Sequence, residues 1–259
     1  MSAEKPLVYL ILGAAGSGRR EVLADLIDGG LGATDQAAVL LAESEAPDEA
    51  ADQQLGAMAR WRWQEEGDGG IDGELPAGAT HVFFVADGRR DPVAQAEVFK
   101  PWVESQGGEI GRVICVVNCA LIEKNPPLLA WFDACVHFSD VVLLNRREGV
   151  PNKWMSDFQA RYTGQFMPCL FEFVKDGRVK NPALVLDPVA RRMTHAFDAE
   201  QDWIFTDAAG DVIEEDEVTD DDEEEVEATP EVDPYFVRDA AHRRAKRIPD
   251  IAKFLEPAP

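Results

Sequence analysis

A run of glycines near the N-terminus has the residue types and spacing of a phosphate-binding loop. Gly13, Gly16 and Gly18 punctuate residues 13–20, and Ser17 stands between the last two. The run follows an apolar stretch and precedes a helical pattern. Backbone N–H groups at such a turn, together with the positive end of the following helix, point at an anion. The spacing equals that of the G-x-x-x-x-G-K-[ST] motif, so we expect phosphate contacts along this loop.

The two residues that complete the motif are changed. Arg19 stands at the position of the motif's lysine, and Arg20 at that of its Mg²⁺-binding hydroxyl. A guanidinium can bind phosphate oxygens bidentately, so Arg19 can still hold a phosphate. Arg20 cannot ligate a metal ion, and Glu21 adds negative charge beside it. Two interpretations stay open: a loop that binds at most a stray anion, and a loop that binds a nucleotide without efficient hydrolysis.

Further arginines follow two other apolar stretches. Arg89 and Arg90 come after one, and Arg146 and Arg147 after the other. Parallel strands place their carboxyl ends at one edge of a sheet, where ligands bind in open α/β folds. These side chains form either an anion site with the arginines of the loop or separate surface charges paired with acids. In the second case the expected partners are Asp87, Asp91 and Glu148.

The elements that must position these residues alternate between apolar runs and helical patterns. Near-continuous apolar runs are typical of parallel strands covered on both faces. The chain therefore predicts an α/β fold with a doubly wound, mostly parallel sheet. The expected strands are Leu7–Leu12, Ala37–Ala42, His81–Val85, Val113–Val117, Val141–Leu144 and Cys169–Val174.

The stretch after the second run is less regular. We expect a helix from about Pro47 to Ala57 and a short strand at 59–64. Trp61 and Trp63 alternate with arginines there, which is typical of a half-buried strand.

Three segments together resemble the CobW-type P-loop GTPases of the CobW/HypB/UreG group of metal-handling NTPases. They are the glycine loop, the turn Gly88-Arg89-Arg90-Asp91-Pro92, and Ser139-Asp140-Val141-Val142-Leu143-Leu144-Asn145, in that order and at that spacing. The resemblance covers about residues 6–185, and the third segment is its most specific part. It implies a P-loop NTPase sheet.

Several residues of the family's nucleotide and metal sites are changed in this chain. The family's loop lysine falls on Arg19 and its Mg²⁺-binding Ser/Thr on Arg20. In the family's E-[ST]-[ST]-G-L-x-x-P motif the glutamate becomes Val85, Asp87 replaces a Ser/Thr, and Gly88 is kept. The family's metal-binding C-x-C-C motif is absent, because no cysteine precedes residue 115.

The guanine-reading N-K-x-D motif of the family becomes Asn145-Arg146-Arg147-Glu148. The resemblance implies that Asn145 keeps its role, that Arg146 stacks over a base, and that Glu148 accepts from guanine with a longer reach. GTP or GDP is the implied ligand, and no Mg²⁺ requirement is expected. No catalytic residue is assigned.

These losses predict a degenerate, regulatory pseudo-GTPase that binds a guanine nucleotide or another anion with little or no hydrolysis. One alternative is a nucleotide-independent interaction scaffold. A second is a slow active GTPase that uses Arg19 in place of lysine. Removing one electrostatic stabiliser of phosphoryl transfer costs about 10²–10⁵ in rate, and several are changed here together.

The charge of the 259-residue chain is strongly negative and unevenly spread. Lys and Arg total 25 against 49 Asp and Glu, and Asp211–Asp233 holds 14 acidic residues and no basic ones. This balance argues against nucleic-acid binding, and such a run is typical of a solvated, disordered segment. We expect a GTPase-like domain over 1–197, an acidic linker over 198–233 and a basic tail over 234–259 with a short helix at Val237–Ile248. The acidic or C-terminal segment is the candidate contact for a protein partner.

The remaining side chains predict no metal site. Cys115, Cys119, Cys135 and Cys169 form no CxxC pair and are interpreted as buried, reduced thiols. The four histidines are far apart. Leu7–Leu12 is too short to cross a bilayer, so we expect a cytoplasmic protein with no membrane contact.

Overall fold

A computed structural model describes residues 5–65, 69–198 and 232–256, together with the backbone of three short strands between the last two ranges. The chain divides into two compact units. One consists of residues 1–193 and 247–259, and the other of residues 194–246.

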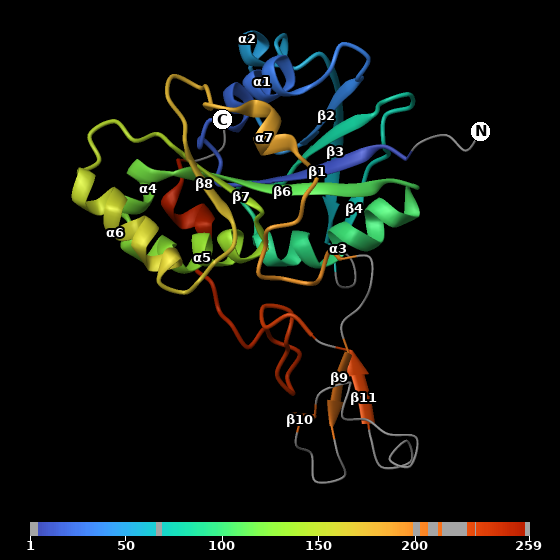
Figure 1. The fold of residues 1–259 in the computed structure, drawn as a ribbon, viewed down its shortest axis with the longest axis vertical. Helices are drawn as coiled ribbons and strands as arrows, with labels where there is room; N and C mark the ends of the chain where they lie inside the picture. The colour runs from blue at the N-terminus through green and yellow to red at the C-terminus, as the bar shows by residue number, and fades with distance from the viewer. Residues whose placement is uncertain are drawn as a thin grey trace. The chain divides into compact units, whose positions relative to one another are not determined.

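The first unit is built on one eight-stranded sheet (Figure 1), with strand order β4-β3-β2-β5-β1-β6-β7-β8. All neighbouring strands are parallel except β3 and β4, which are antiparallel. The strands are β1 Leu7–Leu12, β2 Ala37–Ala42, β3 Ala57–Gln64, β4 Gly70–Asp72, β5 His81–Val85, β6 Glu109–Asn118, β7 Val141–Asn145 and β8 Leu170–Phe173.

Helices cover both faces of this sheet. In Figure 1, α1 and α7 lie on one face and α3 and α5 on the other. The helices are α1 Arg19–Gly30, α2 Glu49–Asp52, α3 Pro92–Ser105, α4 Cys119–Lys124, α5 Leu129–Phe138, α6 Asn152–Thr163 and α7 Pro182–Leu186, with the 3₁₀ turns η1 Pro126–Leu128 and η3 Ile251–Phe254. The predicted doubly wound α/β fold of the P-loop NTPase type is confirmed, and all six predicted apolar runs form strands.

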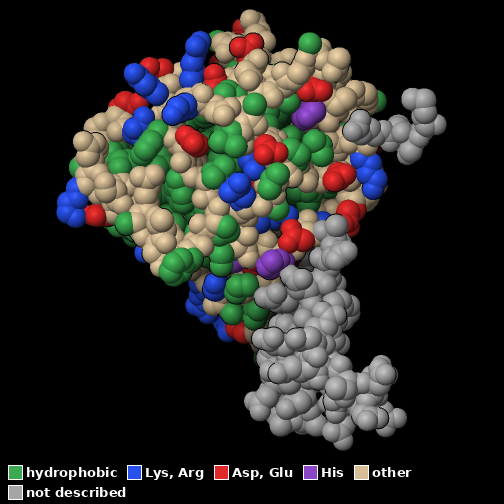
Figure 2. All heavy atoms as spheres, viewed as in Figure 1, with side chains coloured by type: hydrophobic (Ala, Val, Ile, Leu, Met, Phe, Trp, Pro, Cys, Tyr) green, Lys and Arg blue, Asp and Glu red, His purple; other side chains and the backbone are tan. Residues whose placement is uncertain are grey.

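The apolar runs form strands because both faces of the central sheet are buried. Every residue of β7 is buried, and five of the six residues of β1 and of β2 are buried. The four cysteines are free thiols and are buried, as predicted. On the face shown in Figure 2, basic and acidic side chains are interspersed over the described residues.

The segment between β2 and β3 differs from expectation. The predicted helix over Pro47–Ala57 is a single turn, Glu49–Asp52, whose N-terminus is capped by the Asp48 side chain. Gln53 caps the end of this turn, Gly56 has φ 73°, and the strand begins at Ala57.

The strand that follows carries a buried tryptophan, as expected. Trp61 is 1 % exposed, and its Nε1 donates to the carbonyl of Val85 at 2.9 Å. This bond fixes the last residue of β5, two residues before Asp87.

The second unit contains a small antiparallel sheet of order β10-β9-β11. Its strands are β9 Trp203–Thr206, β10 Val212–Ile213 and β11 Glu227–Pro230. The sequence did not predict these strands. Apart from Asp198, Val232 and Asp233, the rest of the predicted acidic linker lies outside the described residues, so its solvated state and the three predicted domain boundaries stay predictions.

The predicted helix over Val237–Ile248 is wrong. Arg238 and Arg244 form an antiparallel bridge there, and the Asp239 carboxylate accepts the N–H groups of Ala241 and Arg243. A side chain that bonds the local backbone in this way favours a turn over a helix. The helical turn described in this region is η3, farther along the chain.

Among the described residues, no helix has the length and apolar character needed to cross a membrane.

Candidate functional site

The glycine loop has the backbone conformation that its sequence predicts. Gly13, Gly16 and Gly18 have φ values of 135°, 76° and 82°, which side chains rarely allow. A Cβ atom at Gly13 would lie 2.4 Å from the carbonyl oxygen of Val116. Gly18 is the N-cap of α1, so the loop leads directly into the positive end of that helix.

Three strand ends hold the loop in place. The N–H of Ala15 donates to the carbonyl of Gly88 at 3.0 Å. The Asn145 amide donates to the carbonyl of Ser17 at 2.8 Å, and the Asn118 amide to that of Gly16 at 3.4 Å. Gly88 and Asn145, both predicted from the sequence, therefore meet at the loop. Asn118, at the end of β6, was not predicted.

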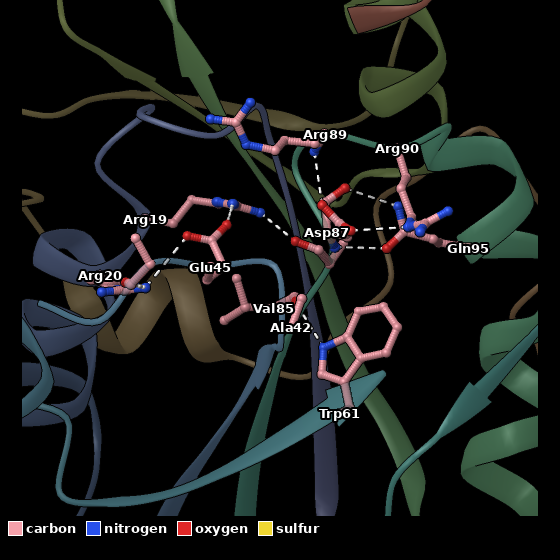
Figure 3. A network of polar contacts seen from close by, with 12 residues as sticks. Arg19, Arg20, Ala42, Glu45, Trp61, Val85, Asp87, Arg89, Arg90 and Gln95 are labelled. Carbon is pink, nitrogen blue, oxygen red and sulfur yellow. Dashed lines mark hydrogen bonds and ion pairs between the residues drawn. The ribbon is translucent and has the colours of Figure 1, made fainter. Parts of the chain in front are cut away.

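Arg19 is buried under the loop, with 4 % of its side chain exposed. Its guanidinium donates to the carbonyl of Ala86 and to the Glu45 carboxylate (Figure 3). It thus fills the space beside the loop that a phosphate-binding cation needs, but its donors are directed at protein acceptors.

Arg20 is held by the same carboxylate. Its Nη2 lies 3.5 Å from Glu45 Oε2 and donates to the carbonyl of Ala46 at 2.6 Å, and its Nη1 lies 3.1 Å from Asp52 Oδ1. Glu45 and Asp52 were not predicted. The available signal was their position, because Glu45 follows the carboxyl end of β2 at the same sheet edge as the loop.

Asp87 is saturated by donors of its own turn. Its Oδ1 accepts from the N–H of Arg89 at 2.9 Å, and its Oδ2 from Nε of Arg90 at 3.0 Å. The side chain of Gln95, on α3, bonds both the N–H and the carbonyl of the same residue. Asp87 is 5 % exposed, and each of its carboxylate oxygens accepts a hydrogen bond that stabilises the turn.

The outer arginines of this edge are also paired. Arg90 Nη1 lies 2.6 Å from Glu65, and Arg89 Nη1 donates to the backbone carbonyl of Glu256 at 2.8 Å. Asp91, one of the expected partners, caps α3 by accepting the N–H groups of Val93 and Ala94.

The candidate base-reading segment lies beside the loop. Arg146 has φ 49° and pairs with Glu21 at 2.7 Å. Arg147 donates to the carbonyl of Val174 at 2.9 Å, and its guanidinium lies 4.8 Å from the centre of the Phe173 ring. Glu148 is exposed.

Some of these groups border a cavity of about 450 Å³, whereas the predicted site residues Asp87, Gly88, Asn145 and Glu148 are not part of its lining. It lies between the glycine loop, the start of α1 and the segment after β2. The lining includes Gly16, Gly18, Arg19, Arg20, Glu21, Glu45, Arg89 and Arg146. Four of the six arginines border this cavity, and all six have acceptors within the protein, so anion binding at this edge stays a prediction.

The residues present do not fit the Mg²⁺ ion that the fold family implies. Arg20 occupies the hydroxyl position, and the carboxylates beside the loop, those of Glu21, Glu45 and Asp87, are already bonded to arginine side chains. No group of three or more His, Cys, Asp or Glu side chains arranged for a metal exists among the described residues.

The matches to known proteins are at the level of structure and have low sequence identity. No family model and no curated protein matches the sequence of this chain. Solved structures give matches at low identity. A Zn(II)-bound triple mutant of the YjiA GTPase is 13 % identical, with 79 % of this chain and 73 % of that chain covered and a TM-score of 0.42. The Zn(II)-bound YjiA GTPase from E. coli is 12 % identical, with 79 % and 72 % covered and a TM-score of 0.38.

A further match is the cell division protein FtsY from Thermotoga maritima. It is 15 % identical, with 72 % of this chain and 69 % of that chain covered and a TM-score of 0.40. The fold assignment rests on the strand order and the loop of the present chain, and the CobW-type likeness stays a resemblance.

Proposed function

We propose that this chain is a pseudo-GTPase: it binds a guanine nucleotide or a related phosphate-bearing anion at the glycine loop and hydrolyses it very slowly or not at all. The observation that carries the proposal is the replacement of the loop's lysine and hydroxyl by Arg19 and Arg20, both fixed by neighbouring acceptors. The loop around them keeps the shape of a phosphate cradle.

Binding is supported by the geometry of the cavity. The N-terminal N–H groups of a helix have no intrahelical acceptor, and the loop ends at such a helix. Guanidinium groups of Arg19, Arg20, Arg89 and Arg146 surround the same space. Two loop arginines supply the positive charge that a lysine and a metal ion supply in the usual motif, so binding should not require Mg²⁺.

Slow or absent hydrolysis follows from what the residues beside the phosphate position can do. Val85 offers no proton acceptor where the resemblance places a glutamate. The Asp87 carboxylate accepts from Arg90 and from a backbone N–H, so it is held in its own turn and directed away from the role of a water-orienting base. Loss of a single group of this kind costs about 10²–10⁵ in rate.

A second candidate function has its own support. Because all six arginines at this edge have protein acceptors, the loop needs no ligand to balance its charge. A nucleotide-independent scaffold, acting through a protein partner of the acidic or C-terminal segment in the cytoplasm, is compatible with this pairing.

Calorimetric titration separates the two candidates. The full chain is titrated with GDP and GTP, each with Mg²⁺ and with EDTA, and with ATP as the control for the base. We expect saturable binding of GDP and GTP, little change on removing Mg²⁺, and no release of phosphate from GTP. Binding of no nucleotide, even at millimolar concentration, would favour the scaffold.

Two variants test the base-reading segment. Glu148→Gln removes the carboxylate proposed to accept from guanine and should reduce the preference for GDP over ADP. Glu104→Gln, an equal charge change at an exposed position in the last turn of α3, is the matched control and should leave the preference unchanged. Turnover of GTP that disappears in Arg19→Ala would instead establish an active enzyme.

A further inference from the structure

Glu45 lies where it can compete with a ligand for the loop arginines. Its Oε1 accepts from Arg19 and its Oε2 lies 3.5 Å from Arg20 Nη2, so one carboxylate bridges both guanidinium groups (Figure 3). Its side chain is 17 % exposed and borders the cavity. The two oxygens thus hold the arginine donors that face the phosphate-binding loop.

The backbone that carries Glu45 is fixed at both ends. Its N–H donates to the carbonyl of Ala42 at 3.0 Å, and its own carbonyl accepts from Arg60 at 2.9 Å. Farther along, Asp52 pairs with Arg20 at 3.1 Å. The segment Ser44–Asp48 is therefore a turn anchored on β2, β3 and α1, and it presents the Glu45 carboxylate to the loop.

We infer that Glu45 is a built-in competitive ligand of the anion site, and that a phosphate or diphosphate group binds by displacing its carboxylate from Arg19 and Arg20. The inference rests on the proposed function, whose anion site it uses. A carboxylate and a phosphoryl group both offer paired oxygens to a guanidinium, so one can replace the other on the same donors.

The fraction of molecules in which the Glu45 carboxylate has left the arginines sets the change in apparent Kd for an anion. When only a fraction of the molecules is free to bind, the apparent Kd equals the intrinsic Kd divided by that fraction. If the Glu45 carboxylate holds the arginines in nine molecules of ten, removing its charge lowers the apparent Kd about tenfold.

The test uses Glu45→Gln in the full chain, with inorganic pyrophosphate and GDP as probes. Glutamine keeps an oxygen that accepts from one arginine, so the variant retains much of the local bonding while losing the charge. Glu43→Gln is the matched control: it removes the same charge two residues away, at an exposed side chain that does not border the cavity. Affinities are measured by calorimetry, and thermal stability is followed with increasing pyrophosphate.

We expect Glu45→Gln to bind pyrophosphate about tenfold more tightly than the unmodified chain and Glu43→Gln to match the unmodified chain. Pyrophosphate should also raise the Tm of Glu45→Gln more than that of the control. Tighter pyrophosphate binding without GDP binding would overturn the guanine-nucleotide function and leave the competition intact. Equal affinities in all three proteins, or no anion binding by Glu45→Gln, would overturn the competition.

Glu45→Asp provides a second variant if the first does not fold. Its side chain is shorter by one methylene and cannot reach both arginines at once. It should bind pyrophosphate more tightly than the unmodified chain, and unchanged affinity in a folded Glu45→Asp would also overturn the inference.

Discussion

The Arg19–Glu45 pair shows how a buried charge changes the role of a loop. Arg19 is almost fully buried, and taking a guanidinium out of water is costly unless its donors are satisfied. The Ala86 carbonyl and the Glu45 carboxylate satisfy them within the protein. A lysine at this position presents a point charge with rotatable donors, whereas the planar guanidinium fixes two acceptors at once. With arginine at this position, the loop therefore needs no bound ligand to satisfy its buried charge.

Arg19→Ala should destabilise the protein strongly. It leaves the Glu45 carboxylate with Arg20 alone and removes the bond to the carbonyl of Ala86, so we expect a loss of about 1–3 kcal/mol in the free energy of unfolding. Urea denaturation measures it. Lys153→Ala, which breaks an exposed pair with Asp157 on α6, is the control and should have little effect. Equal losses in the two variants would contradict the structural role of Arg19.

The buried thiols should be unreactive in the folded protein. Burial raises the pKa of Cys119 and of Cys169 to about 12, so neither is ionised near neutrality. We expect labelling by an aromatic disulfide reagent at pH 8 only after denaturation. The unfolded chain releases these protons from about pH 9, while the folded chain keeps them up to about pH 12. Stability should therefore fall progressively across that interval. Rapid labelling of the native protein would contradict the burial.

At the scale of the elements, the loop depends on a close approach between two turns. Ala15, after β1, donates to Gly88, after β5, and a Cβ atom at Gly88 would lie 2.4 Å from the Ala15 nitrogen. Gly88 is needed here for its small size, because two of the three nearest atoms belong to the backbone of Ala14 and Ala15 and cannot move aside separately.

Gly88→Ala should displace the loop. We expect a loss of about 1–3 kcal/mol in the free energy of unfolding, as for other overpacked sites. When Gly88→Ala is combined with Glu45→Gln, the double variant should no longer bind pyrophosphate. Gly70→Ala, on β4, is the control, since its Cβ atom would meet its nearest neighbour at 3.5 Å, an ordinary contact. Calorimetry and urea denaturation of both variants check the expectation. Unchanged binding in the Gly88 variant would show that the loop tolerates the shift.

The central strands were predictable because burial on both faces imposes continuous apolar runs. β1, β2, β5 and β7 are such runs, and the glycine loop follows the first of them. Gly88 and Asn145 lie beside the loop because each stands at or just after the carboxyl end of a strand, and their part in nucleotide binding stays a prediction.

Contacts made by ordinary loop acids were not predictable. Nothing in the sequence around Glu45 distinguishes it from Glu43, and only the folded turn directs one of them at Arg19. The helix expected at Val237–Ile248 failed for a related reason, because the bonds of Asp239 to the backbone depend on a turn that periodicity does not reveal.

At the scale of the whole molecule, negative charge concentrated in one segment should weaken anion binding. Residues 214–225 hold ten acidic side chains and no basic ones. Changing these ten to Asn and Gln keeps the chain length and should tighten pyrophosphate binding at low ionic strength, because like charges repel the ligand. At high salt the difference should vanish. Calorimetry at two salt concentrations measures this, and equal affinities at low salt would contradict it.

The discontinuous make-up of the first unit has a consequence for the end of the chain. Residues 247–259 belong to that unit, where Ile251 is 1 % exposed and the Glu256 carbonyl accepts from Arg89. Residues 194–246 are thus an insertion between two segments of the first unit, and both ends of the insertion are joined to that unit. Such connectivity keeps a short peptide at high local concentration beside its docking groups. A single proteolytic cut within residues 194–246 would make the contact between residues 247–259 and the rest of the first unit bimolecular. Dilution would then separate the two fragments.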